Sequence, residues 1–423
     1  MIGSNISDTA QNQPLRICLL GYRSNPHCGG QGVYIKNLSR ALMGLGHMVD
    51  VISGQPYPIL DDGVGLVKLP SLDLYNPDDL FRIPKLNELC DPINLIEWIG
   101  VATMGFSEIQ TFGMRARRYL QKHGHQYDIV HDNQSLSYGV WRIKRKMPTV
   151  ATIHHPITVD LEIAVKSETE LWKKLKHLRW HSFLGMQKQV ARTLPHMITV
   201  SECARKDISR EFGIPAHRFS IIPNGIDTDL FYPVPEIPRQ KNRIIVTNSA
   251  DTPLKGLHYL LSSVAKIAKS QSVRLVVVGT PKKNGKIVRH IQALGIGRFV
   301  TFTGRISDAE FVRQYAKASV AVVPSIYEGF GLPAGEAMAC GVPVISTTGG
   351  ALPEVVGDAG ILVPPADTPA LTRAILDVFN NPGLAEKLSA AGYNRVQNHL
   401  TWTAAAQKTV DVYRQAIDDH RKI

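Results

Sequence analysis

Two glutamates, Glu328 and Glu336, stand on either side of a glycine-rich stretch late in the chain. Residues 329–335 between them read GFGLPAG, and the preceding run 320–324, VAVVP, has the apolar character of a buried strand. Pro333 is a residue that favours the first turn of a helix. The pattern therefore predicts a strand, a tight glycine turn and the start of a helix.

This pattern favours binding of a ligand that has both phosphate and hydroxyl groups. Backbone N–H groups of residues 329–332 would be unpaired at the positive end of a helix, which attracts phosphate. Carboxylates repel phosphate but accept hydrogen bonds strongly from hydroxyls. A nucleotide sugar carries both kinds of group. Taken alone, the glutamates also fit a structural role, with Glu336 favouring the helix start and Glu328 solvated in a loop.

The longer stretch 324–354, PSIYEGFGLPAGEAMACGVPVISTTGGALPE, closely resembles the signature of retaining glycosyltransferases of family 4, which have the GT-B fold. The resemblance implies an α/β protein of two Rossmann-like, doubly wound parallel-sheet domains facing a central cleft. It also implies a hexosyltransferase-type enzyme with a nucleoside diphosphate sugar as co-substrate. No other cofactor and no metal are expected.

Length and composition agree with a two-domain globular protein. A chain of 423 residues is longer than one hydrophobic core usually serves. The five cysteines form no C-x-x-C pair, which indicates neither a disulfide framework nor a zinc site and fits a reducing compartment.

The N-terminal residues lack the pattern of a secretory signal, and no apolar run is long enough to cross a bilayer. A cytoplasmic protein is expected, with peripheral contact at the inner face of the membrane as an open alternative. The net charge of +12 fits an anionic partner such as a membrane surface or a phosphorylated substrate. Nucleic acid is not expected as a partner, because no nucleic-acid-binding module is recognisable.

Strands and helices alternate in two series. In the first, the apolar run 16–21 is followed by Gly29, Gly30 and Gly32 and then by a helical run, 33–45. This spacing is not G-x-G-x-x-G, so a dinucleotide site, and with it a dehydrogenase, is poorly supported. The predicted domains are an acceptor-side domain (1–225, joined by the C-terminal helix 402–423), a proline-rich linker (226–240) and a donor domain (241–401).

Lys255 matches the lysine that binds phosphate in the resembled family. The chain departs from the family pattern at 248–251, where NSAD replaces a Gly-Arg pair. Arg305, or Lys282 and Lys283, could supply the second phosphate cation. Asp227-Thr228-Asp229 could hold a divalent metal, but its place beside the linker favours a turn.

His154 and His155 follow the apolar run 149–153, at the end of a strand where ligands bind in open parallel sheets. By resemblance, His154 approaches the donor sugar; packing in the core is the alternative. The loop at Gly29 and Gly30 is expected to approach the diphosphate.

Within the 328–336 stretch, the resemblance implies that Glu336 holds the ribose and Glu328 the sugar hydroxyls. The backbone of Gly329, Phe330, Gly331 and Leu332 completes this predicted donor site. Attack from the same face, with the leaving phosphate oxygen taking the acceptor proton, is the implied mechanism.

The acceptor remains open among a lipid, a sugar and a small molecule. Segment 166–192 combines apolar residues at helical spacing with basic residues, which fits either contact with an anionic membrane or packing on the protein's own sheet. Segment 81–112 lacks a clear period and could form an acceptor-side lid. Because the family arginine is missing, a non-catalytic nucleotide-sugar binding or scaffold protein is the alternative function. The presence of Glu328, Glu336, Lys255 and His154 argues against it.

Overall fold

The computed structural model describes residues 13–25, 30–76, 79, 82–166, 168, 170–247 and 252–422. Gly29 and the segment 248–251, where the family arginine was expected, lie outside the described residues. The chain divides into two units. Unit 1 holds the chain up to Val200, then Ala204–Ile222, and again from Ala405 onward, whereas unit 2 holds Ser201–Cys203 and Pro223–Ala404.

The described part of unit 1 is built on a seven-stranded parallel sheet with the order β3-β2-β1-β4-β5-β6-β7. The strands are β1 (Arg16–Gly21), β2 (Met48–Ser53), β3 (Gly65–Lys68), β4 (Ile129–Asn133), β5 (Thr149–Ile153), β6 (Met197–Thr199) and β7 (Phe219–Ile221). The winding direction reverses between β1 and β4. This is the predicted doubly wound arrangement, and the carboxyl edge at such a reversal is the usual place for ligands.

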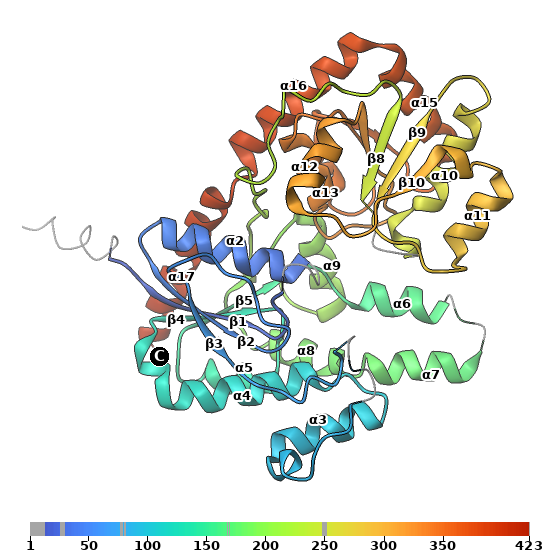
Figure 1. Cartoon of the computed structure of the whole chain (residues 1–423). Coiled ribbons are helices and arrows are strands. Elements are labelled where there is room, and N and C mark those ends of the chain that lie inside the picture. The colour runs from blue at the N-terminus through green and yellow to red at the C-terminus, as the bar shows by residue number, and fades with distance from the viewer. Residues whose placement is uncertain are drawn as a thin grey trace, which may run out of the picture. The chain divides into compact units, whose positions relative to one another are not determined.

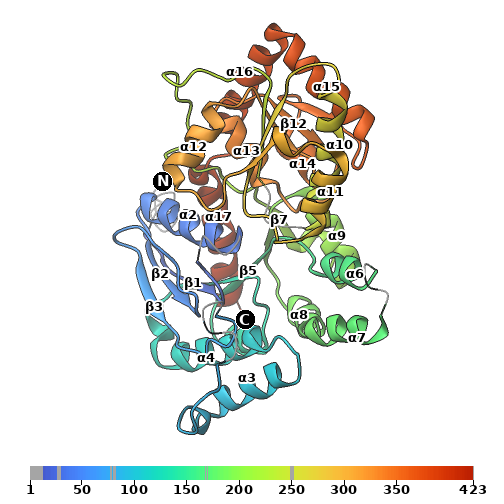
Figure 2. The same cartoon turned by 45° about the vertical axis from the view of Figure 1, so that its right-hand side comes forward.

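Helices cover both faces of this sheet (Figures 1 and 2). The helices of unit 1 are α2 (Gly30–Gly44), α3 (Pro92–Ala102), α4 (Glu108–His123), α5 (Tyr138–Ile143), α6 (Thr158–Lys166), α7 (Leu171–Trp180), α8 (Phe183–Ala191), α9 (Glu202–Phe212) and α17 (Trp402–Arg421), with the 3₁₀ turns η2 (Glu88–Cys90), η3 (Gly124–Gln126) and η4 (Ala216–Arg218). On one face, α4 and α5 pack over Cys18, Leu20 and Val130 of the sheet. The two helices touch closely, since a Cβ on Gly139 would lie 2.0 Å from the carbonyl oxygen of Gly113.

The opposite face of the sheet is crossed by α17, which returns from unit 2 to unit 1. Tyr413 on α17 shares a hydrogen bond of 2.5 Å with Nδ1 of His131 on β4. The other ring nitrogen, Nε2, lies 2.7 Å from Oγ1 of Thr152, which is also 2.9 Å from the hydroxyl of Tyr34 on α2. Burial lowers the pKa of His131 to about 3, so its ring is neutral and joins these hydroxyls as one donor and one acceptor.

Unit 2 has a six-stranded parallel sheet in its described residues, with the order β10-β9-β8-β11-β12-β13. Its strands are β8 (Arg243–Thr247), β9 (Arg274–Val278), β10 (Val300–Phe302), β11 (Val320–Val323), β12 (Val344–Thr347) and β13 (Ile361–Val363). Its helices are α10 (Leu257–Ile267), α11 (Lys286–Leu294), α12 (Asp308–Ala316), α13 (Leu332–Ala339), α14 (Leu352–Val356), α15 (Thr368–Asn380) and α16 (Pro382–His399), with η5 (Pro253–Lys255) and η6 (Gly297–Phe299). The apolar sides of α10 and α15 form one core with β8, β9 and β11. Two Rossmann-like units are therefore present, as the sequence predicts.

Two segments differ in detail from expectation. Segment 81–112, for which no period was evident, contains α3 and the start of α4. The run 166–192 is not one helix, because it breaks near Ser182 between α7 and α8. Its halves differ in burial: α8 buries Leu184, Met186 and Val190, whereas α7 exposes its apolar residues, Leu171, Trp172, Leu175 and Leu178. Among the described residues, no helix is long and apolar enough to cross a membrane.

Candidate functional site

Neighbouring strands β8 and β11 bring Lys255 and Glu328 to the same edge of the unit 2 sheet. After β8 the chain reaches the 3₁₀ turn η5, and after β11 it enters the 324–331 loop. The backbone N–H of Ile326 donates to the carbonyl of Leu254 at 2.7 Å. Gly256 has φ of +65°, and a Cβ there would lie 1.9 Å from the carbonyl oxygen of Pro324. Glycine thus permits the close approach of the two loops.

The Lys255 ammonium forms an ion pair with Glu328, with Nζ 2.6 Å from Oε1. The hydroxyl of Ser325 donates to the same oxygen at 2.9 Å. Glu328 is largely buried, with 12 % of its side chain exposed, compared with 32 % for Lys255. The described residues provide no partner for the other oxygen, Oε2. The carboxylate is held through one oxygen and has the second available for a ligand hydroxyl.

The glycine turn lies directly before α13. Gly331 has φ of +104° and is the N-cap residue of that helix. In the described part of the chain, the backbone N–H groups of Gly329, Phe330 and Gly331 donate to no acceptor. The Ala351 N–H donates to the Glu328 carbonyl at 2.8 Å, which fixes the start of the turn. Unpaired N–H groups at a helix start beside a lysine can bind phosphate oxygens.

Glu336 lies within α13, one helical turn beyond these N–H groups. Its side chain is half-buried, and burial raises the pKa of Glu336 to about 7. The Tyr315 hydroxyl, 3.4 Å from Oε2, acts in the opposite direction by donating to the carboxylate. This carboxyl group therefore changes charge near neutral pH, whereas an ordinary glutamate does so near pH 4.5.

Arg305 is not brought to the Lys255–Glu328 pair by any contact in the described residues. It is exposed in the loop after β10, and β10 is an edge strand separated from β8 by β9. Lys282 and Lys283 are likewise exposed, in the loop after β9.

In unit 1, His154 stands at the carboxyl end of β5. Its Nε2 lies 2.7 Å from Oδ1 of Asn133, and its backbone N–H donates to Oε1 of Gln134 at 2.7 Å. Burial, together with His155 and His131, lowers the pKa of His154 to about 3. The neutral ring must donate through Nε2–H to the amide oxygen, which makes Nδ1 the free acceptor. His154 can thus orient a hydroxyl group but carries no charge for a phosphate.

Gly30, the described member of the predicted glycine pair, is the exposed first residue of α2. A Cβ at this position would meet no atom within 4 Å. The start of α2 is therefore open on the side where a side chain would project.

The Asp227-Thr228-Asp229 triplet contains a turn. The Asp227 carbonyl accepts from the N–H groups of Leu230 at 3.2 Å and Phe231 at 2.8 Å. Elsewhere in the described chain, as here, no cluster of three or more His, Cys, Asp or Glu residues has metal-binding geometry.

Sequence reasoning missed Ser325, Tyr315 and Asn133, which orient the predicted site residues. Ser325 lies in the same loop as Glu328 and could have been recognised as a local partner. Tyr315 and Asn133 are 21 residues away from Glu336 and His154, respectively, so their contacts depend on packing between elements.

Comparison with known proteins identifies both halves of the chain. The model "Glycosyltransferase Family 4" matches residues 28–230, and "Glycosyl transferases group 1" matches residues 232–395. An "MMP alpha-(1->4)-mannosyltransferase" of Mycolicibacterium hassiacum is 45 % identical over 408 residues, covering 95 % of this chain and 98 % of the relative. A D-inositol 3-phosphate glycosyltransferase of Catenulispora acidiphila is 26 % identical, covering 98 % of each chain.

Among solved structures, sucrose-phosphate synthase from Thermosynechococcus elongatus superposes with a TM-score of 0.74 at 26 % identity. The match covers 96 % of this chain and all of the other. Sequence and architecture therefore agree along nearly the whole length, and the resemblance in the 324–354 stretch is confirmed. The chain belongs to glycosyltransferase family 4 and is a glycosyltransferase with a GT-B fold.

Proposed function

We propose that this protein is a retaining α-mannosyltransferase that needs no metal and moves mannose from a nucleoside diphosphate mannose to a sugar hydroxyl. The 45 % identical mannosyltransferase supports the choice of sugar. The α-(1→4) linkage in the name of that relative supports a sugar hydroxyl as the acceptor. Similarity to a working transferase also favours turnover over the non-catalytic binding alternative.

The free oxygen of Glu328 is the observation that carries this proposal. One carboxylate oxygen is engaged by Lys255 and Ser325, and Oε2 is available for donor hydroxyls. Lys255 and the unpaired N–H groups of 329–331 supply positive potential for the diphosphate. Glu336 would accept from the ribose. This arrangement meets the two needs of a nucleotide sugar, hydroxyl acceptors and phosphate donors, within one sheet edge.

The proposed transfer breaks the bond between the sugar C1 and the phosphate oxygen, and the electron pair stays on that oxygen. A bond forms between C1 and the acceptor oxygen on the same face, and the acceptor proton passes to the departing phosphate oxygen. Lys255 and the turn N–H groups stabilise the charge that develops on the diphosphate. The neutral His154 ring, through Nδ1, orients a hydroxyl of the donor sugar.

Nucleoside diphosphate release tests this function directly. The chain is given mannose and glucose donors of several nucleobases, with a chelator and a mannose oligosaccharide acceptor. Lys255→Ala is expected to lower turnover by roughly 10²–10³-fold, as loss of a charge-stabilising group does. Exposed Lys387→Ala is the matched control and should retain the wild-type rate. A strict metal requirement, a β-linked product by NMR, or preference for a glucose donor would each contradict the corresponding part of the proposal.

We also propose that α7, through its exposed apolar side chains, contacts an anionic membrane surface. Leu171 and Trp172 are 72 % and 60 % exposed, and Lys173 and Lys174 follow them directly. Such a helix can lie in the interface of an anionic bilayer. Sedimentation with phosphatidylglycerol vesicles should decrease in Trp172→Ser, relative to Trp98→Ser on α3. Equal sedimentation of both variants would remove α7 from the proposal.

A further inference from the structure

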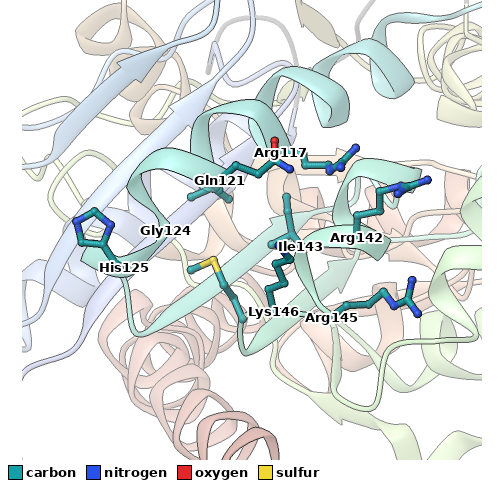
Figure 3. Close-up of a pocket in the computed structure, with 10 residues that line it drawn as sticks. Arg117, Gln121, Gly124, His125, Arg142, Ile143, Arg145 and Lys146 are labelled. Atoms are coloured by element: carbon teal, nitrogen blue, oxygen red, sulfur yellow. The ribbon is translucent and has the colours of Figure 1, made fainter.

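A cavity of about 580 Å³ lies in unit 1 between the C-terminal ends of α4 and α5 (Figure 3). Its floor is apolar and is formed by Leu120, Ile143 and Met147. Its rim is basic and consists of Arg117, His125, Arg142, Arg145 and Lys146. The side chains of Arg117, Arg142 and Arg145 extend toward the same side of the cavity (Figure 3).

The positive charge of this rim is not neutralised within the described protein. None of the described lining residues is Asp or Glu. The side chains of Arg117, Arg142, Arg145 and Lys146 form no ion pair or hydrogen bond with any described residue. Arg142 and Arg145 lie 5.8 and 5.0 Å from the ring of Trp141, which helps to orient both guanidinium groups.

The neighbouring Lys144 is affected by the surplus of positive charge. Burial lowers the pKa of Lys144, and Arg145 and Arg218 lower it further. Lys144 satisfies its ammonium by donating to the carbonyl of Thr193 at 2.5 Å, rather than by pairing with a carboxylate. Cations grouped at this density repel one another, so an anion bound among them would relieve the repulsion.

This cavity lies at the amino ends of the strands, whereas His154 lies at their carboxyl ends. Residues 121–126 lead into the amino end of β4, and residues 142–148 lead into the amino end of β5. His154 follows the carboxyl end of β5. A five-residue strand spans on the order of 15 Å. The cavity and His154 therefore lie at opposite ends of β5. None of the residues proposed for the transfer reaction lines this cavity.

We propose that the cavity is a second binding site, for a ligand that carries phosphate on a less polar body. Arginine forks match phosphate oxygens in two parallel hydrogen bonds, and several cations together exceed the charge of one phosphate. The apolar floor accepts the less polar part of the ligand. The same chemistry is offered by a soluble phosphorylated metabolite and by a phospholipid headgroup.

Hydrogen exchange of the full-length chain distinguishes the site and the source of the ligand. Inorganic pyrophosphate, phosphatidylglycerol vesicles and neutral phosphatidylcholine vesicles are the three probes. The double variant Arg142→Gln/Arg145→Gln is compared with Lys387→Gln/Lys408→Gln, which removes the same charge from exposed sites elsewhere. Lys255→Ala serves as a variant of the donor site, where pyrophosphate is also expected to bind.

Slower exchange in segments 117–126 and 142–147 with pyrophosphate, lost in the cavity variant but kept in the charge control and in Lys255→Ala, supports a soluble ligand. The same pattern with phosphatidylglycerol vesicles, and not with phosphatidylcholine, supports a lipid headgroup. In titrations, the cavity variant should bind the effective probe at least tenfold more weakly. Protection absent with every probe, or reduced equally in the charge control, overturns the proposal without bearing on the transfer reaction.

Discussion

The carboxylate of Glu328 has two different surroundings, one at each oxygen. Oε1 accepts from Lys255 and from Ser325, and Oε2 has no partner among the described residues. If Glu328 served only to pair with Lys255, both of its carboxylate oxygens could be bonded within the protein. The asymmetry suits a residue that must remain fixed while it accepts hydroxyls from a bound sugar.

Glu328→Gln tests this interpretation, because the amide keeps the shape but removes the charge. Hydrogen bonds to charged groups contribute about 1.5–3 kcal/mol, so kcat/KM should fall by roughly 10- to 100-fold. Initial rates with the preferred donor provide the measurement. Glu386→Gln, an exposed glutamate on α16, is the control. Wild-type rates in Glu328→Gln would exclude a charged contact with the donor.

A second residue-scale prediction concerns pH and Glu336. With a pKa of about 7, this side chain is an acid below neutral pH and a carboxylate above it. In the proposed donor site the ribose needs the carboxylate as acceptor, so the donor KM should rise as the pH falls below 7, by roughly tenfold per unit. Glu336→Gln should flatten the profile. Tyr315→Phe, which removes a donor to the carboxylate, should move the midpoint upward.

The same shift has a defined sign for stability. The folded pKa lies above the ordinary value of 4.5, so folding favours the protonated form. That contribution is complete below pH 4.5 and is lost as the pH rises through 7. Chemical unfolding of the ligand-free chain at pH 5 and pH 8 should therefore show a smaller pH effect in Glu336→Gln. An unchanged KM profile in that variant would contradict the assigned role.

At the scale of elements, the site depends on how closely the loop after β8 approaches the loop after β11. Gly256 and Gly295 form a matched pair for testing this, because their φ angles are +65° and +67°. A Cβ on Gly256 would meet the Pro324 carbonyl, whereas a Cβ on Gly295 would meet nothing within 4 Å. Alanine would be strained to a similar extent at either position, but only alanine at position 256 would also clash with a neighbouring atom.

We expect Gly295→Ala to cost roughly 1–2 kcal/mol of the free energy of unfolding, the usual penalty of a left-handed residue, and to leave activity intact. Gly256→Ala should cost more and should also lower kcat/KM, because the clash moves Lys255 away from Glu328. Urea unfolding and initial rates measure the two effects. Similar losses in both variants would show that the close approach of the loops does not position Lys255.

Several elements of this site were predictable from the chain because their signals are local. The apolar run before Glu328 becomes β11, and Pro333 lies in the first turn of α13. The Lys255–Glu328 pair was not predictable from spacing, since 73 residues separate the partners and only the adjacency of β8 and β11 joins them. The break between α7 and α8 was also not predictable from the sequence. The apolar periodicity continues across Ser182, although the apolar side chains are exposed in α7 and buried in α8.

At the scale of the whole molecule, α17 ties the end of the chain to the first sheet. Tyr413, His131, Thr152 and Tyr34 form a buried chain of hydrogen bonds, and the Tyr34 ring lies edge-on to His154 at 4.7 Å between centroids. The carboxyl end of β5 is therefore supported by a helix that comes last in the sequence.

Tyr413→Phe should leave one nitrogen of His131 buried without a partner and lower the free energy of unfolding by about 1–3 kcal/mol. Tyr393→Phe is the control, because that hydroxyl forms no hydrogen bond within the described residues. Denaturant melts measure the difference. Equal stability of the two variants would show that the His131 contact contributes little.

The path of α17 also constrains how parts of this protein can be exchanged with relatives. Unit 1 is discontinuous, because its sheet comes from residues 16–221 and one of its covering helices from the last residues. A chimera that takes everything after Ile222 from another transferase would replace α17 together with unit 2. It would then place a foreign helix over His131. Two crossover points, one after Ile222 and one near Ala404, would exchange unit 2 while keeping the native helix on its sheet.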